Sequence, residues 1–512
     1  MNAPPRHRPR GRREPPDFSA PRGSAAGYAF RGGRSRVLAR PLRPTGPAVL
    51  LAYLAFLAAQ ATLIVRPMDV FPALSGVQLF LPFILLALLL AIPNLVHQAQ
   101  PKQLLRQPIN LCVLGMIVAV ALSLVSQGLI GWSLKATSEF TKVALYYLAL
   151  TAVLTTPRRL KTFLLVTAIA AACMVVLSIR DFRSFNAEWL ERSDLWEEYE
   201  KDRKREALGE PKVIRHVLER HGVNAEGDPE IFFRMRGFGV FSDPNDIALL
   251  IVATAILLMW FMSESDTKGY WPLWLGMMAV LLWGLWLTQS RGGLLAAGAA
   301  FMVFLLMNYG RQVATVIGLA GACVAPVALG RLGAISLSSG TGHDRIGLWA
   351  EGLEAMKGKA LFFGIGQGRY EDMSSSQLVA HNSYVHAFTE LGLFGGTIFC
   401  GLVFFSFFGF YRLRSIKHEI RDRTVYSLLP IVPAIVTGWA VGMGSLSRCY
   451  TPATYLVFGI AASYLNLAGA SLAAPRPLVR LNRYTIPRWI GFSAGVLLTA
   501  YAFVRVFGGT GG

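Results

Sequence analysis

Apolar and polar stretches alternate along most of this chain, and the apolar ones are long. Each runs for roughly 20 residues, the length that a helix needs to cross the hydrocarbon core of a bilayer. Because that core offers no water to the backbone, such runs must be helical. The pattern predicts an all-α polytopic membrane protein with about 12–13 transmembrane helices. They are expected near residues 46–65, 78–96, 109–127, 139–156, 162–179, 244–262, 272–289, 292–308, 312–330, 388–411, 425–445, 452–469 and 489–507, and whether the last one spans is left open.

Two long polar segments, about 180–243 and 331–387, interrupt the apolar runs. In the first, Glu and Lys recur at helical i,i+4 spacing over Trp196–His221, which predicts a solvated helix. Its end, Asp243-Pro-Asn245, is a turn and helix-start signal before the next apolar run. In the second segment, apolar residues recur at spacings of three and four from Ile346 to Met356, which predicts a short amphipathic helix on the membrane surface.

Composition excludes a water-soluble protein and gives the charge a topological meaning. Hydrophobic residues make up 53% of the chain and charged residues only 16%, against about 25% charged in soluble domains. The net charge is +20, and much of it lies in an Arg- and Pro-rich tail, residues 1–45, which should be disordered in the cytoplasm. Headgroup binding by this tail is possible, and nucleic-acid binding is not expected, because no aromatic residues interleave with its arginines.

The distribution of Lys and Arg between alternate loops predicts the orientation in the membrane. One set of loops shares the positive sign of the tail, and it contains Lys102, Arg106, Arg158, Arg159, Lys161, Arg311, Arg412, Arg414, Lys417, Arg421, Arg423, Arg476, Arg480, Arg483 and Arg488. The alternate set has few basic residues, namely Arg66, Lys135, Arg291 and Arg448. We therefore expect a cytoplasmic N-terminus, with residues 46–512 forming the membrane domain and both long segments outside. In a bacterial cell this means the inner membrane, with the site facing the periplasm.

One stretch combines a glycine-rich turn with a histidine at the predicted boundary between water and membrane. It runs Gly364-Ile-Gly-Gln-Gly-Arg369, then His381-Asn382, then Glu390-Leu-Gly-Leu-Phe-Gly-Gly396. With Arg345 and Trp349 before it, this order resembles the O-antigen ligase and polysaccharide polymerase superfamily over about residues 230–400. The resemblance implies a membrane glycosyltransferase in which the histidine is the base. As a phosphate cradle the glycines are weak, since no strand–turn–helix context surrounds them, and a flexible turn is the simpler interpretation.

Arginines near one predicted membrane face invite an anionic ligand. Guanidinium groups bind phosphate through bidentate, charge-assisted hydrogen bonds. The candidates for binding a diphosphate are Arg234, Arg236, Arg291, Arg345 and Arg448. The simpler alternative is contact with lipid headgroups, which we favour for Arg448. For Arg291 we favour the ligand interpretation, because glycines follow it and family members carry a matching Ser-Arg-Gly. The sequence does not rank Arg234 against Arg236.

His381 is the candidate catalytic residue, since imidazole suits proton transfer near neutral pH. It could instead be a polar residue at a helix start beside Asn382, a good N-cap. Glu390 is a supporting residue that could orient His386 or an arginine, or interact with the helix dipole. His386 itself is expected to be a helix-face residue of lesser importance. No cofactor or metal is predicted, although zinc held by His343, His381 and His386 is a minor alternative.

The favoured hypothesis is a metal-independent, inverting glycosyltransferase. Its donor would be an undecaprenyl-diphosphate-linked glycan, and its acceptor lipid A–core or a growing polysaccharide. The alternative is a polysaccharide flippase or secondary transporter, which would place ionisable residues mid-membrane and break helices there. The apolar runs here carry almost no charge at their centres, which disfavours transport. The sequence does not separate ligase from polymerase.

Overall fold

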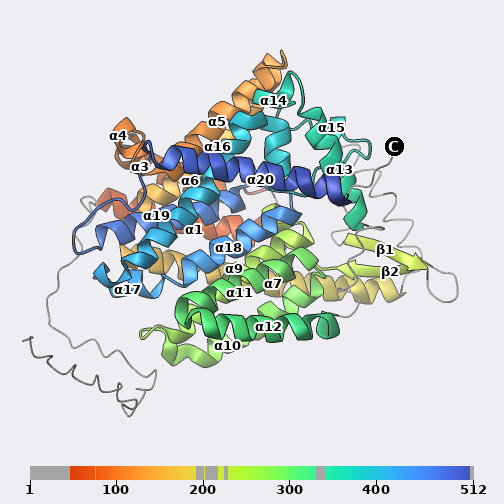
Figure 1. Ribbon diagram of the computed structural model, residues 1–512. Helices are drawn as coiled ribbons and strands as arrows, with labels where there is room; N and C mark the ends of the chain where they lie inside the picture. The colour runs from red at the N-terminus through yellow and green to blue at the C-terminus, as the bar shows by residue number, and fades with distance from the viewer. Residues whose placement is uncertain are drawn as a thin grey trace, which may run out of the picture. The chain divides into compact units, whose positions relative to one another are not determined.

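A computed structural model describes residues 47–74, 76–191, 201, 217–223, 229–329 and 341–507, and they are almost entirely helical (Figure 1). The predicted tail, residues 1–45, lies outside this described part. Every predicted apolar run forms a helix. These are α1 (Pro47–Val65), α3 (Phe80–Gln98), α5 (Pro108–Val125), α6 (Ile130–Val153), α7 (Pro157–Glu191), α9 (Pro244–Ser263), α10 (Trp271–Leu287), α11 (Arg291–Asn308), α12 (Gly310–Leu329), α16 (Ser383–Ser415), α18 (Ile431–Gly442), α19 (Pro452–Ala470) and α20 (Thr485–Phe507).

By length and composition, 11 helices in the described part are able to cross a membrane. This confirms the predicted fold class, a polytopic helical membrane protein, with a slightly smaller number than 12–13. Helices α6 and α12 are outside this set. The first half of α6 is polar and contains Lys135 and Glu139, and Lys142 follows directly. The predicted last span is among the 11, as Thr485–Phe507.

Helix α16 lies at the centre of the elements that surround the predicted site. It packs against α5, α19, α20 and α13 (Thr341–Ala355). Its backbone breaks at Gly392, where φ is 67°, so the carbonyls before the break lose their helical partners. On another side of the core, α9 packs against α11, α18, α7 and α10. The candidate site lies at the N-termini of α9, α11 and α16.

The first long segment ends in a short antiparallel hairpin, β1 (Val217–Val223) with β2 (Pro229–Arg234), in which Val217 pairs with Arg234. The helix predicted over Trp196–His221 is therefore wrong at its C-terminal end. Most of the remainder of that prediction lies outside the described residues. The pairing strand, Pro-Glu-Ile-Phe-Phe-Arg, is rich in the β-branched and aromatic residues that favour strands. The i,i+4 charge pairs behind the helix prediction precede β1, so they did not bear on the residues that form the strand.

The second long segment contains the predicted amphipathic helix, α13, followed by two single turns, α14 (Ala360–Phe363) and α15 (Tyr370–Met373). Ile346 of α13 and Met356, which directly follows this helix, are buried, while Glu354 is exposed, as the spacing predicts. Its Trp349 Nε1 donates to the carbonyl of Ala380 at 2.7 Å. Helix α13 thereby holds the chain immediately before His381.

The predicted orientation can be tested across α16, because Ser375 and Ser415 lie before and after this helix and are both exposed. We expect Ser375→Cys to react with an impermeant maleimide in intact spheroplasts, and Ser415→Cys to react only after lysis. The reverse pattern would invert the topology and would place the site on the cytoplasmic side.

Candidate functional site

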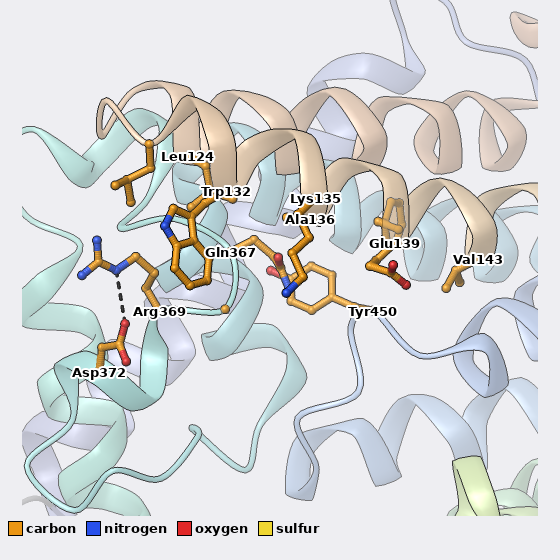
Figure 2. A pocket seen from close by; sticks show the side chains of 13 residues that line it. Leu124, Trp132, Lys135, Ala136, Glu139, Val143, Gln367, Arg369, Asp372 and Tyr450 are labelled. Atoms are coloured by element: carbon orange, nitrogen blue, oxygen red, sulfur yellow. Dashed lines mark ion pairs between the residues drawn. The ribbon is translucent and has the colours of Figure 1, made fainter. Parts of the chain in front are cut away.

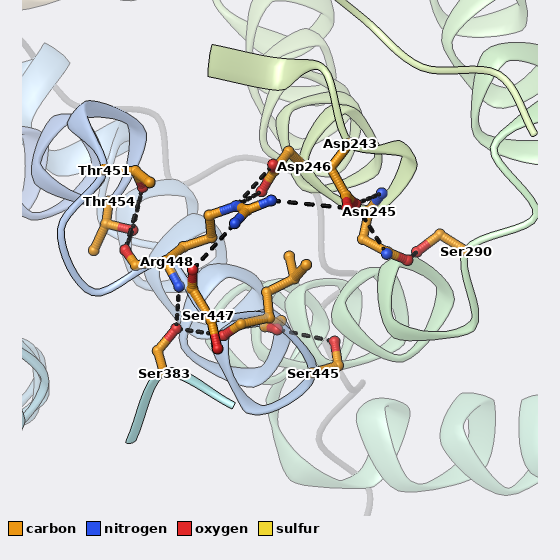
Figure 3. A network of polar contacts seen from close by, with 12 residues as sticks. Asp243, Asn245, Asp246, Ser290, Ser383, Ser445, Ser447, Arg448, Thr451 and Thr454 are labelled. Carbon is orange, nitrogen blue, oxygen red and sulfur yellow. Dashed lines mark hydrogen bonds and ion pairs between the residues drawn. The ribbon is translucent and has the colours of Figure 1, made fainter. Parts of the chain in front are cut away.

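Two helix N-termini meet at the centre of the polar network in Figure 3. Asp243 caps α9, and its Oδ1 accepts from the backbone N–H of Asn245 at 2.7 Å. Ser290 caps α11, and its hydroxyl accepts from the N–H of Gly293 at 3.0 Å. The two caps are joined because Ser290 Oγ donates to Asn245 Oδ1 at 2.7 Å. The Asp-Pro-Asn helix start is thus confirmed, and it also fixes α9 relative to α11.

Arg234 is attached to this junction. Its Nη2 donates to Asn245 Oδ1 at 3.0 Å, and its Nε donates to the carbonyl of Thr288 at 3.0 Å. The following residue, Met235, donates its N–H to the carbonyl of Leu287 at 2.9 Å. The chain leaving β2 is therefore fastened along the C-terminal end of α10. Arg236 lies two residues further on and is half-buried.

Arg448 is bound to the same region by a buried ion pair. Its Nε lies 2.7 Å and 2.8 Å from the two carboxylate oxygens of Asp246, and its Nη2 lies 3.7 Å from Asp243 Oδ2. The Arg448 side chain is 26% exposed and that of Asp246 is 7% exposed. Burial lowers the pKa of Arg448, but the two carboxylates outweigh it and the net direction is upward. Arg448 therefore lies within a protein network, which differs from the lipid-headgroup contact that we favoured from sequence.

The segment that carries Arg448 is tied to the start of α16. Ser383 Oγ donates to the carbonyl of Leu446 at 2.5 Å and accepts from the N–H of Arg448 at 2.9 Å. Asn382 caps α16, since its Oδ1 accepts from the N–H groups of Tyr384 and Val385 at 3.0 Å and 3.2 Å. The predicted capping role of Asn382 is confirmed. These bonds fix His381, which directly precedes the cap, relative to Arg448.

His381 has a strained backbone and a shifted pKa. Its φ is 48°, a left-handed conformation that is uncommon for non-glycine residues and concentrates at functional sites. Burial, the Arg345 charge and, more weakly, the Arg448 charge together lower the pKa of His381 to about 4, while Asp243 opposes them. The imidazole is therefore neutral at pH 7 and able to accept a proton. Arg345, Arg448 and Asp243 are all close enough to act on it.

Glu390 and His386 form a pair one turn apart inside α16. His386 Nε2 lies 3.0 Å from Glu390 Oε1, and the side chains are only 9% and 1% exposed. Glu390 Oε1 also accepts from the N–H of Tyr370 at 3.1 Å. Of the roles considered for Glu390, contact with His386 is the one observed. His386 is a buried partner of this carboxylate, so its interpretation as a simple helix-face residue was wrong.

The glycine-rich turn packs against the break in α16. The N–H groups of Ile365 and Gly366 donate to the carbonyls of Thr389 and Glu390 at 3.0 Å and 3.1 Å. A Cβ at Gly364 would overlap the backbone of Glu390, so only glycine allows this approach. The turn is thus fixed rather than flexible, and two of its N–H groups are used by α16 instead of being open to a phosphate.

Arg291 and Arg345 complete the predicted set. Arg291 is the first residue of α11, next to the Ser290 cap, and is half-buried. Within the described part of the chain it makes no ion pair or side-chain hydrogen bond. Arg345 is half-buried in α13 and acts electrostatically on His381. The structure thus brings Arg234, Arg345, Arg448 and His381 to one region, with Arg291 beside the cap that joins two of their helices.

Sequence reasoning missed the roles of two carboxylates. Asp246, the partner of Arg448, could have been suspected because an ionisable residue in a membrane segment needs a partner. Asp243 was identified only as a helix start. In the described part, no three His, Cys, Asp or Glu side chains lie close enough to hold a metal ion, and the side chain of His343 lies outside that part.

Part of the chain matches a known protein family. Residues 276–400 match the family model described as O-antigen ligase. This region begins in α10 and contains α11, Arg345, His381 and the first half of α16 up to Cys400. No curated protein matches.

Proposed function

We propose that this chain, a member of the O-antigen ligase superfamily, is a membrane glycosyltransferase that moves a glycan from an undecaprenyl-diphosphate carrier to an acceptor hydroxyl. The acceptor sugar belongs to lipid A–core or to a growing polysaccharide. The observation that carries the proposal is the position of His381, a neutral imidazole among arginine side chains at the meeting point of three helix ends.

The proposed reaction uses the two kinds of group for different steps. The donor diphosphate is bound by Arg291 and Arg345, together with Arg234 and Arg448 of the polar network. His381 removes the proton from the acceptor hydroxyl, whose oxygen attacks the anomeric carbon with inversion. The bond from that carbon to the diphosphate oxygen breaks, and the leaving diphosphate gains a negative charge. Fixed positive charge at the point where charge develops is usually the largest catalytic contribution, and here it would replace the divalent cation that many transferases use.

The direct test uses the full-length protein in vesicles with a radiolabelled lipid-diphosphate glycan. Lipid A–core and a second lipid-linked glycan are supplied separately as acceptors, with and without EDTA. We expect transfer to one of the two, resistant to EDTA, and the productive acceptor assigns ligase or polymerase activity. Translocation of the labelled lipid without transfer to either acceptor would instead favour the flippase.

Arg291→Lys provides a second test, because lysine keeps the charge but loses the bidentate fork. We expect the transfer rate to fall on the order of 10²–10³-fold, as for loss of one transition-state donor, with normal membrane insertion. The rate is measured at saturating donor and acceptor. Arg414→Lys, at the far end of α16, is the matched control and should be active. A fully active Arg291→Lys enzyme would mean that Arg291 only meets lipid headgroups.

A further inference from the structure

Figure 2 shows a cavity of about 580 Å³. None of the arginines Arg234, Arg291, Arg345 and Arg448, here called the arginine network, lines it. The cavity is bounded by the first half of α6, the end of α5, the glycine-rich turn, and Tyr450 from the segment between α18 and α19. Its volume is within the range of pockets that bind small molecules. Tyr450 packs against Phe140 of α6, with ring centroids 6.1 Å apart, whereas Arg448 points to α9. The cavity and the arginine network therefore lie next to two different faces of one short segment.

The cavity explains the composition of α6. Lys135 and Glu139 lie on the first half of this helix, which is too polar to count among the spans, and both line the cavity. Polar and ionisable residues in a membrane domain are costly and usually face a water-filled space or a ligand. The polar half of α6 is thus accounted for by a ligand-accessible cavity.

The opposite wall is fixed in advance of any ligand. The side-chain amide of Gln127 donates to the carbonyl of Gly364 at 2.8 Å, and the N–H of Gln367 donates to Ser123 Oγ at 3.1 Å. Together with its bonds to α16, these contacts leave the turn little freedom. A preformed wall reduces the ordering cost of binding.

The lining offers donors and acceptors in balance. The four charged side chains of the lining, Lys135, Glu139, Arg369 and Asp372, have a formal net charge of zero, and Arg369 pairs with Asp372 at 3.4 Å. The side-chain amide of Gln367, which lines the cavity, both donates and accepts. Hydroxyl groups need both donors and acceptors, whereas a phosphate needs donors only. The cavity therefore suits a polyhydroxylated ligand, and the arginine network suits an anion.

Aromatic rings complete this chemistry. Trp132, Phe140 and Tyr450 line the cavity, and Figure 2 shows the Trp132 and Tyr450 rings among the polar side chains of the lining. Aromatic faces give large, rigid apolar contact, which matches the C–H face of a sugar ring. We propose that this cavity is a glycan-binding subsite, which takes the sugars of a substrate while the arginine network takes its diphosphate. The inference rests on the proposed function, because that function makes a glycan the substrate.

The test is a binding assay that needs no turnover, with the full-length protein in detergent. The probes are the oligosaccharide released by mild acid from the lipid-linked glycan of the producing cells, and inorganic pyrophosphate. The variants are Trp132→Ala, Trp132→Phe and Gln367→Ala. Trp271→Ala, also at an exposed helix start, is the control. We expect Trp132→Ala to weaken oligosaccharide binding about tenfold, since an aromatic face contributes on that scale, and Trp132→Phe to restore most of this binding. Gln367→Ala, which removes the side-chain amide, should weaken oligosaccharide binding to a similar extent. Pyrophosphate binding should not change.

The outcomes separate this inference from the proposed function. Wild-type oligosaccharide affinity in both cavity variants, or pyrophosphate binding without oligosaccharide binding, would overturn the subsite. The cavity variants could lose oligosaccharide binding and keep pyrophosphate binding in a protein that never transfers glycan in vesicles. That result would support the subsite and count against the proposed function. In an active enzyme, a raised KM of Trp132→Ala for the acceptor assigns the cavity to the acceptor glycan. A raised KM for the donor assigns it to the donor glycan.

Discussion

We expect His381→Ala to abolish glycan transfer while the protein stays folded in the membrane. A positioned general base contributes on the order of 10²–10⁴-fold to the rate, and the nearby His386 cannot take its place, because it is buried against Glu390. Donor binding should survive, since it is assigned to arginines. The measurement is transfer rate per folded protein, together with donor affinity.

The comparison variant His386→Ala is expected to affect folding. His386→Ala would leave the Glu390 carboxylate buried without its partner, which is strongly destabilising, so we expect loss of folded protein rather than loss of rate per folded molecule. Retention of more than a tenth of the activity by His381→Ala would remove His381 from the mechanism. So would a greater loss per folded protein in His386→Ala.

The pH dependence carries a second signature of the same residue. A base must be deprotonated to act, and the pKa of His381 is lowered to about 4 by burial and by nearby arginine charge. We therefore expect kcat/KM, which reports the free enzyme, to fall only as pH drops toward about 4. Bound diphosphate neutralises arginine charge, so the acid limb of kcat should lie at higher pH. Coincident limbs near pH 6.5 would show that these charges do not act on the base.

The membrane helices could be predicted because each needs only length and apolarity, and these are local properties. Helix starts such as Asp243 and Asn382 were also predictable, since a cap bonds to its own first turn. The hairpin was not, because it depends on pairing between two segments rather than on the pattern within one. The polar first half of α6 keeps this helix out of the set of spans. Its polar residues line the cavity, which only the tertiary structure shows.

The candidate site was predictable in its residues and unpredictable in its pairings. Arg448 looked like a lipid contact because nothing in the sequence connects it with Asp246, 202 residues away. Similarly, the turn at Gly364 suggested flexibility, whereas Gly364 and Gly392 permit a close approach between this turn and the break in α16. Sequence spacing identifies which side chains are chemically suitable, and the tertiary fold decides which of them are already occupied by each other.

The buried pair of Arg448 and Asp246 gives the largest expected effect on stability. Arg448→Met keeps the length of the side chain but leaves Asp246 as an unpaired carboxylate inside the bundle. Breaking a buried pair in this way costs about 3–5 kcal/mol, and we expect the lower end because the Arg448 side chain is 26% exposed. Native proteins are stable by only about 5–15 kcal/mol. Thermal unfolding in detergent should therefore shift markedly downward, while Arg414→Met, which changes an exposed arginine, should not shift it.

The double variant Arg448→Met with Asp246→Leu separates structure from chemistry. Replacing both members of a buried pair by apolar residues is often neutral or stabilising, so we expect thermal stability to return. Transfer should not return, because the guanidinium that is proposed to help hold the diphosphate is still missing. A stable and active double variant would show that Arg448 only joins α9 to the start of α16, and diphosphate binding would then fall to the remaining arginines. Wild-type stability in Arg448→Met alone would contradict the structural role instead.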